Sequence, residues 1–139
     1  MPSYAQRCIE EARPFLQGHG QIASQYITAS LDPIPFSNQP DLVFVPGVGP
    51  NANIAYVVEF KEGQFWRLDM ALLKLALEHQ IDVLRANPDA SIVYLLVTPA
   101  ELSHNQVTWC QNRKLRVLQH VSNGAELATI LRVWAALPD

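Results

Sequence analysis

Long hydrophobic runs are missing from this chain of 139 residues. Its longest apolar stretches, such as Ser91 to Val97, are far shorter than the roughly 20 residues that a helix needs to cross a bilayer. The opening residues also lack the basic start and apolar run of a secretory signal. These absences predict a soluble, cytoplasmic protein without a membrane partner.

Cysteine is nearly absent too, and histidine forms no motif. Cys8 and Cys110 are the only cysteines, with no Cys-x-x-Cys pair and no histidine at zinc-ligand spacing. A structural zinc site or a disulfide framework is therefore not expected, and both residues are interpreted as small buried apolar side chains. The four histidines make no His-Glu-x-x-His, and no serine lies in a Gly-x-Ser-x-Gly setting. Zinc proteolysis and acyl transfer therefore have no support.

Basic residues are few, because 10 Lys and Arg stand against 13 Asp and Glu and the formal net charge is -3. Wrapping nucleic acid requires clustered Lys and Arg that neutralise phosphates, so a broad basic surface is not expected. A local groove remains open. The one dense basic run is Arg113-Lys114-Leu115-Arg116, which fits either phosphate contacts or the solvated end of a helix.

What the chain does have is the composition of a globular domain, with 49% hydrophobic and 17% charged residues. We expect one domain over residues 1–139, ordered from end to end. The expected elements are a helix from Ser3 to Gly18, a weak strand within 21–28, strands over 42–45 and 54–61, a helix over 66–86, a strand over 91–97, a helix starting at Thr98-Pro99, a strand over 115–121 and a helix after Gly124. This order predicts an α/β fold, a mixed β-sheet flanked by helices.

Charged residues mark the two strands of the expected hairpin. Asp41, in Pro40-Asp41, opens the first strand, and Glu59-Phe60-Lys61 ends the second. Residues two apart in a strand point to the same face, so Glu59 and Lys61 project together. Pairing of the two strands brings the Asp41 carboxylate toward Glu59.

Two neighbouring carboxylates repel each other unless a cation neutralises them, and oxygen ligands suit Mg²⁺ or Mn²⁺. Such a metal activates water for hydrolysis, and a lysine beside it can either orient the nucleophile or stabilise the developing negative charge. The competing interpretation is less specific: Glu-x-Lys is also a common surface ion pair of little energetic value, and Pro-Asp is a common turn opening.

Together, Pro40-Asp41 and Glu59-Phe60-Lys61 resemble the motif of the PD-(D/E)xK nuclease superfamily, which includes restriction endonucleases and Holliday-junction resolvases. The resemblance implies a restriction-endonuclease-like αβββαβ core over residues from about 3 to 97, followed by a C-terminal αβα extension. It makes Asp41 and Glu59 metal ligands together with the Phe60 backbone carbonyl, and gives Lys61 a catalytic role.

Many members of this superfamily add an acid from the first helix. Glu11 lies at the edge of the apolar stripe of that helix, whereas Glu10 lies nearly opposite the stripe, so Glu11 is the predicted fourth member of the site. Candidate nucleic-acid contacts are Trp66, Arg67, Gln80, Arg113, Lys114 and Arg116. For Trp66 and Arg67 a role as anchors at the start of a buried helix remains an equal alternative, and the chain has no clear Gln-x-x-x-Tyr around Gln80.

The resemblance and the motif predict a divalent-metal-dependent endonuclease that hydrolyses DNA phosphodiester bonds with Mg²⁺ or Mn²⁺. A chain of this size has little surface for gripping DNA, so a homodimer is expected. The alternative is a catalytically inactive nuclease-like module that binds or regulates through an oligomeric or partner-protein interface. The acidic net charge and the apolar stretch 67–86 favour that alternative.

Overall fold

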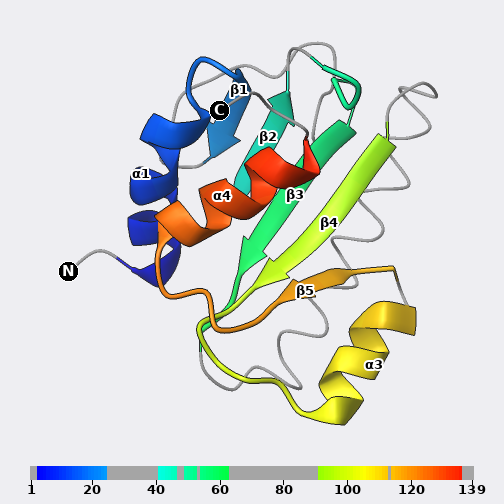
Figure 1. The fold of residues 1–139 in the computed structure, drawn as a ribbon. Coiled ribbons are helices and arrows are strands. Elements are labelled where there is room, and N and C mark those ends of the chain that lie inside the picture. The colour runs from blue at the N-terminus through cyan, green and yellow to red at the C-terminus, as the bar shows by residue number, and fades with distance from the viewer. Residues whose placement is uncertain are drawn as a thin grey trace.

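The computed structural model describes residues 3–24, 41–46, 49–52, 54–62, 91–112 and 114–135. Within these residues the chain is an α/β protein whose five strands form one mixed sheet flanked by helices (Figure 1). The elements are α1 (Tyr4–Leu16), β1 (Gly20–Ser24), β2 (Leu42–Pro46), β3 (Ile54–Phe60), β4 (Ser91–Val97), α3 (His104–Asn112), β5 (Arg116–Leu118) and α4 (Gly124–Trp134). The predicted mixed sheet is confirmed.

The strands lie in the order of the sequence, β1-β2-β3-β4-β5. β1, β2 and β3 pair antiparallel, whereas β3, β4 and β5 pair parallel. The expected hairpin is therefore present, and its pairing runs from Phe44 opposite Tyr56 to Leu42 opposite Val58. This register places the start of β2 beside the end of β3, where the charged residues of the sequence lie.

Helix α1 begins as its sequence predicts. The Ser3 hydroxyl accepts a hydrogen bond at 3.1 Å from the backbone N–H of Gln6, which satisfies one of the donors that a helix start leaves unpaired. One face of the helix is buried and consists of Tyr4, Cys8, Ile9, Ala12 and Leu16, at the three- and four-residue spacing of an amphipathic helix.

Side-chain alternation along the strands gives the sheet two apolar faces. On one face Leu42, Phe44, Tyr56, Val58 and Phe60 pack against α1 and α4, which Figure 1 shows on the same side of the sheet. The other face carries a second cluster that α3 joins through Cys110 and its neighbours: Val43, Ala55, Val57, Tyr94, Leu96, Leu102, Cys110 and Leu115. We call these the α1/α4 face and the α3 face.

Helix α4 begins at Gly124, where it crosses α1. Its N-cap is Asn123, whose side chain accepts a hydrogen bond at 3.0 Å from the Glu126 N–H. A Cβ atom on Gly124 would collide with the Cys8 carbonyl oxygen and would lie only 2.6 Å from the Ala12 nitrogen. Both neighbours are backbone atoms of α1, so a side chain here would push the helices apart.

Substituting Gly124 by alanine is therefore expected to lower the free energy of unfolding by about 1–3 kcal/mol, the usual range for overpacking, although alanine is otherwise the better helix former. Urea denaturation followed by circular dichroism measures the change. Ala125→Ser, at the exposed next position, serves as the control. Unchanged stability of Gly124→Ala would contradict the close approach of α1 and α4.

The start of α3 corrects a prediction. Thr98 was expected to cap a helix, but its hydroxyl accepts from the Ala100 N–H in a local turn, and α3 begins at His104. The capping pair is Ser103 and Gln106, each of which accepts a hydrogen bond from the backbone N–H of the other. Two cap patterns follow each other in this stretch, and the second one initiates the helix.

The predicted helix over 66–86 lies outside the described residues. Among the residues that are described, no helix is long and apolar enough to span a membrane.

Candidate metal site

Asp41 lies immediately before β2, beside the last residues of β3. The pairing of β2 with β3 ends at Leu42 and Val58. The next N–H of β3 that points toward β2 belongs to Phe60, and no backbone group of β2 pairs with it. Asp41 supplies that partner: its Oδ2 accepts a hydrogen bond from the Phe60 N–H at 2.9 Å. The carboxylate is thereby held against the end of β3.

Glu59 brings a second carboxyl group to the same place. Burial raises the pKa of Glu59 from 4.5 to about 7, and the negative charge of Asp41 and a hydrogen bond shared with its carboxyl group act in the same direction. The Lys61 charge and a hydrogen bond from the Asp41 backbone act in the opposite direction. The two predicted carboxyl groups therefore converge, as the hairpin requires.

Lys61 follows β3 directly. Its backbone is held beside the end of β4 by a hydrogen bond of 2.9 Å, which its N–H donates to the Val97 carbonyl oxygen. Because strand side chains alternate, Lys61 shares the α3 face with Glu59. Its ammonium group lowers the pKa of Glu59, so it lies within electrostatic reach of that carboxyl group. The three residues of the predicted constellation meet at one end of the sheet.

Phe60 contributes its backbone to this site and its side chain to the α1/α4 face. Its ring is buried against Tyr4 of α1, edge-on, with a distance of 5.8 Å between ring centroids. In a strand the N–H and C=O of one residue point to the same side, so the Phe60 carbonyl oxygen points toward β2, as its N–H does. That orientation suits the predicted role of the carbonyl oxygen as a third oxygen donor.

One residue of the site was missed by the sequence interpretation. Tyr94 lies on β4, opposite Val57 in the register and on the same α3 face as Glu59. It is only 3% exposed. Burial raises the pKa of its hydroxyl group above the ordinary value, and the charge of Glu59 raises it further. The signal was hidden because Tyr94 stands in a continuous apolar run.

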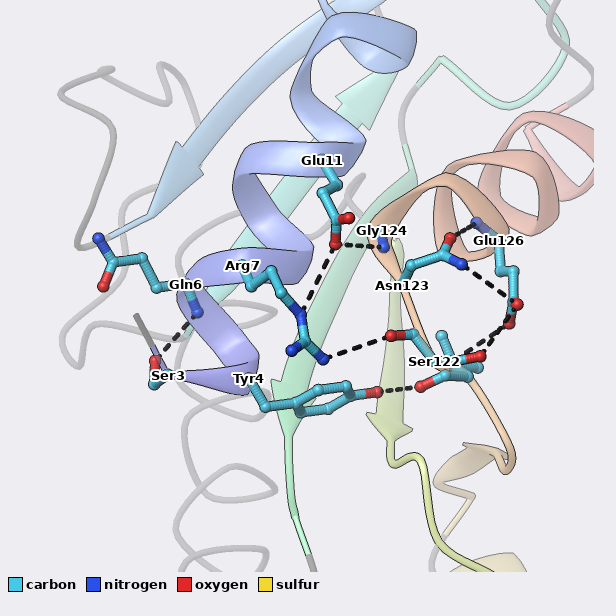
Figure 2. Close-up of polar contacts among 10 residues, drawn as sticks. Ser3, Tyr4, Gln6, Arg7, Glu11, Ser122, Asn123, Gly124 and Glu126 are labelled. Carbon is cyan, nitrogen blue, oxygen red and sulfur yellow. Dashed lines mark hydrogen bonds and ion pairs between the residues drawn. The ribbon is translucent and has the colours of Figure 1, made fainter. Parts of the chain in front are cut away.

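Glu11 is not brought to this pair. In Figure 2 its side chain points from α1 to the start of α4, where its Oε1 accepts a hydrogen bond at 3.4 Å from the Gly124 N–H and lies 3.9 Å from the Arg7 Nε. Helix α1 covers the α1/α4 face, whereas Asp41 and Glu59 share the other face. The prediction of Glu11 as a fourth ligand is corrected: the residue satisfies a helix N-terminus.

Two of the six candidate nucleic-acid contacts, Lys114 and Arg116, lie within the described residues. Arg116, on β5, lies over the Trp134 ring at 5.2 Å from its centroid, on the α1/α4 face and away from the carboxyl pair. Lys114 is exposed, has a positive φ of 59° and donates its N–H to the Gln111 carbonyl oxygen. The other four, Trp66, Arg67, Gln80 and Arg113, lie outside the described residues.

The donor set fits a hard divalent cation. Asp41, Glu59 and the Phe60 carbonyl offer oxygen atoms only, and Mg²⁺ is commonly held by one or two carboxylates with water and substrate phosphate completing the shell. No group of three or more His, Cys, Asp or Glu side chains converges within the described part of the chain. Burial first, and then the negative charge of Asp41, raise the pKa of Glu59, and a cation held between the two carboxylates would offset both effects.

Comparison with known proteins shows a likeness of fold and gives no information about function. Neither a protein-family model nor a curated protein matches the chain. The crystal structure of protein VC1899 from Vibrio cholerae is similar, with a TM-score of 0.53 and 19% sequence identity. The match covers 95% of this chain but only 32% of that protein, so the chain spans about a third of the length of its structural neighbour. At this identity the likeness concerns the arrangement of elements.

Proposed function

We propose that this protein is a divalent-metal-dependent nuclease that hydrolyses DNA phosphodiester bonds with Mg²⁺ or Mn²⁺. The observation that carries the proposal is the convergence of the Asp41 and Glu59 carboxyl groups with the Lys61 ammonium group at one end of the sheet. A carboxyl pair inside a protein is costly without a neutralising partner, so its presence beside a lysine calls for a functional reason.

The proposal includes a restriction-endonuclease-like fold. Helix α1, the antiparallel strands β1 to β3 and the parallel strand β4 follow the order that the superfamily resemblance implies. The elements α3, β5 and α4 then correspond to the C-terminal extension. The motif residues lie where β2 begins and β3 ends, which supports this assignment.

The residues of the chain have distinct tasks in this mechanism. Asp41, Glu59 and the Phe60 carbonyl would hold the cation, and the hydrogen bond from the Phe60 N–H fixes the orientation of Asp41. The bound metal would supply a water of lowered pKa and offset charge on a phosphoryl oxygen. Lys61 would stabilise the negative charge that develops during attack. The apolar cluster of the α3 face would exclude water from the side of the site that faces the protein interior.

Titration with Mn²⁺ tests the metal site directly. Wild-type protein is expected to bind Mn²⁺, and Asp41→Asn is expected to weaken binding by at least about 100-fold. That loss exceeds the usual one for a residue that only hydrogen-bonds to a metal ligand. Asparagine keeps an oxygen that accepts from the Phe60 N–H, so the local backbone is preserved while the charge is lost. Calorimetric titration at pH 8 measures both affinities.

Cleavage assays on single-stranded, duplex and branched DNA complete the test. Activity should require Mg²⁺ or Mn²⁺ and should be lost in Asp41→Asn. Glu62→Gln, which removes an exposed carboxylate next to the site, is the matched control and should retain both binding and cleavage. Failure of the wild-type protein to bind Mn²⁺, or equal affinity in Asp41→Asn, would overturn the proposed metal site.

A second candidate function is a nuclease-like module without catalysis that binds a partner protein. It is favoured by the pKa of Glu59, which at about 7 lets the pair share a proton at neutral pH and so exist without a cation. The formal net charge of -3 also suits a partner other than DNA. Absence of Mn²⁺ binding, together with no cleavage of any DNA, would support this candidate.

The proposed nuclease acts as a homodimer, in which two sites are presented to the two strands of DNA. Light scattering at micromolar concentration is expected to give twice the mass of the chain, and a monomeric mass would exclude the dimer.

A further inference from the structure

Tyr94 lies beside Glu59 on the α3 face. In the parallel register Val57 stands opposite Tyr94 and Glu59 opposite Leu96, so Tyr94 and Glu59 are diagonal neighbours on adjacent strands. Diagonal neighbours on one sheet face are within reach of a long aromatic side chain. Tyr94 is 3% exposed and belongs to the apolar cluster of this face, so its side chain is buried on the side of the sheet that carries Glu59.

A buried tyrosine hydroxyl group usually has a polar partner, because leaving it unpaired costs free energy. Within the described residues, the Glu59 carboxylate is the charged group that acts on this hydroxyl. Phenylalanine would fill the same apolar space without this requirement. The choice of tyrosine at the edge of an acidic pair therefore points to a polar task.

We propose that Tyr94 is a positioning residue of the metal site, whose hydroxyl group donates a hydrogen bond to the Glu59 carboxylate when that carboxylate holds the cation. This inference rests on the proposed metal-dependent function. A hydrogen bond to one oxygen of Glu59 leaves the other oxygen directed at the cation and compensates charge inside the apolar face. Ligating carboxylates are commonly supported in this way, and loss of the support weakens metal binding.

Tyr56 provides a matched control for the alternative that Tyr94 is only a packing residue. It is 2% exposed, lies on β3 and stacks on Phe44 with ring centroids 6.5 Å apart, but it belongs to the α1/α4 face. Tyr56→Phe thus removes a buried hydroxyl group from the opposite side of the same sheet. A packing effect would be similar for the two substitutions, whereas a positioning effect is confined to Tyr94.

The experiment measures Mn²⁺ affinity and cleavage for wild type, Tyr94→Phe, Tyr56→Phe and Asp41→Asn. Tyr94→Phe is expected to raise the Kd for Mn²⁺ by roughly 10- to 100-fold, with a cleavage rate at saturating Mn²⁺ within a few-fold of wild type. Tyr56→Phe should leave the Kd unchanged. Thermal denaturation with chelator shows that both variants are folded.

The outcomes separate this inference from the proposed function. If Asp41→Asn loses Mn²⁺ while Tyr94→Phe and Tyr56→Phe bind it equally well, the role of Tyr94 is refuted and the metal site stands. If wild type binds no Mn²⁺, or Asp41→Asn binds it normally, both the metal site and the role of Tyr94 are refuted. A Kd that is raised in Tyr94→Phe but unchanged in Tyr56→Phe supports the inference.

Discussion

Replacing Lys61 by methionine is expected to lower the rate of metal-dependent DNA cleavage by roughly 100- to 10,000-fold while Mn²⁺ binding remains. Lys61 shares the α3 face with Glu59, and its charge already acts on that carboxyl group. It is therefore placed to stabilise the negative charge that develops on a phosphoryl oxygen, which a neutral side chain of similar length cannot do. The loss belongs to the transition state, not to metal capture.

The affinity for Mn²⁺ should stay within a few-fold of wild type in this variant, because Lys61 is not a ligand and removing a cation lowers the repulsion of the metal. Single-turnover cleavage at saturating Mn²⁺ and calorimetric titration measure the two properties separately. The competing interpretation, a surface ion pair with Glu59, predicts a stability change of about 1 kcal/mol or less and no effect on cleavage. Wild-type rates in Lys61→Met would therefore remove Lys61 from the mechanism.

The carboxyl pair was predictable from the sequence because strand geometry fixes it. A hairpin between the strands at Asp41 and Glu59, together with the two-residue alternation of side chains, is enough to bring these groups together. Nothing outside the hairpin is needed. The meander β1 to β3 and the buried strand β4 followed from the same local patterns.

Glu11 shows where such reasoning stops. A helical wheel tells which side of α1 the residue occupies but not which element lies opposite that side. The neighbour is the start of α4, and Gly124 stands 113 positions farther along the chain. Only the packing of α1 on α4 reveals that the carboxylate of Glu11 is engaged there (Figure 2).

The role of Tyr94 and the start of α3 were not predicted for a related reason. A continuous apolar strand gives no alternation, so its sequence does not tell which residues share a face with Glu59; the parallel register supplies that. For α3, Thr98 and Ser103 both open cap patterns. The Thr98 hydroxyl accepts a hydrogen bond from the Ala100 N–H, and that contact depends on the direction of the chain after β4.

The second large effect concerns stability without metal. Glu59→Gln is expected to raise the free energy of unfolding by about 3 kcal/mol at pH 8 in the presence of a chelator. The pKa of Glu59 is about 7 in the folded protein and 4.5 in an unfolded chain, and this difference corresponds to that free energy. Glutamine resembles the protonated carboxyl group, being neutral and able to donate a hydrogen bond to Asp41.

The direction of the pH dependence follows from the raised pKa. Below pH 4.5 the carboxyl group is protonated in both states, so wild type and Glu59→Gln should be about equally stable there. As pH rises to about 7, the unfolded chain releases its proton first and the wild-type protein loses stability, whereas Glu59→Gln does not. Urea denaturation at several pH values measures the divergence, with Glu62→Gln as an exposed control.

Added Mn²⁺ should remove most of the stability advantage of Glu59→Gln. Binding to the folded state stabilises wild type by an amount that grows with the ratio of free metal to Kd, about 2.7 kcal/mol at a hundredfold excess over Kd. Glu59→Gln has lost one of two carboxylate ligands and gains little. A variant that is more stable than wild type in chelator and loses this advantage in Mn²⁺ would show that the site keeps its charge for a cation. Equal stability of the two proteins at pH 8 in chelator would instead mean that the carboxyl pair carries no penalty, and the argument for a cation at this position would fail.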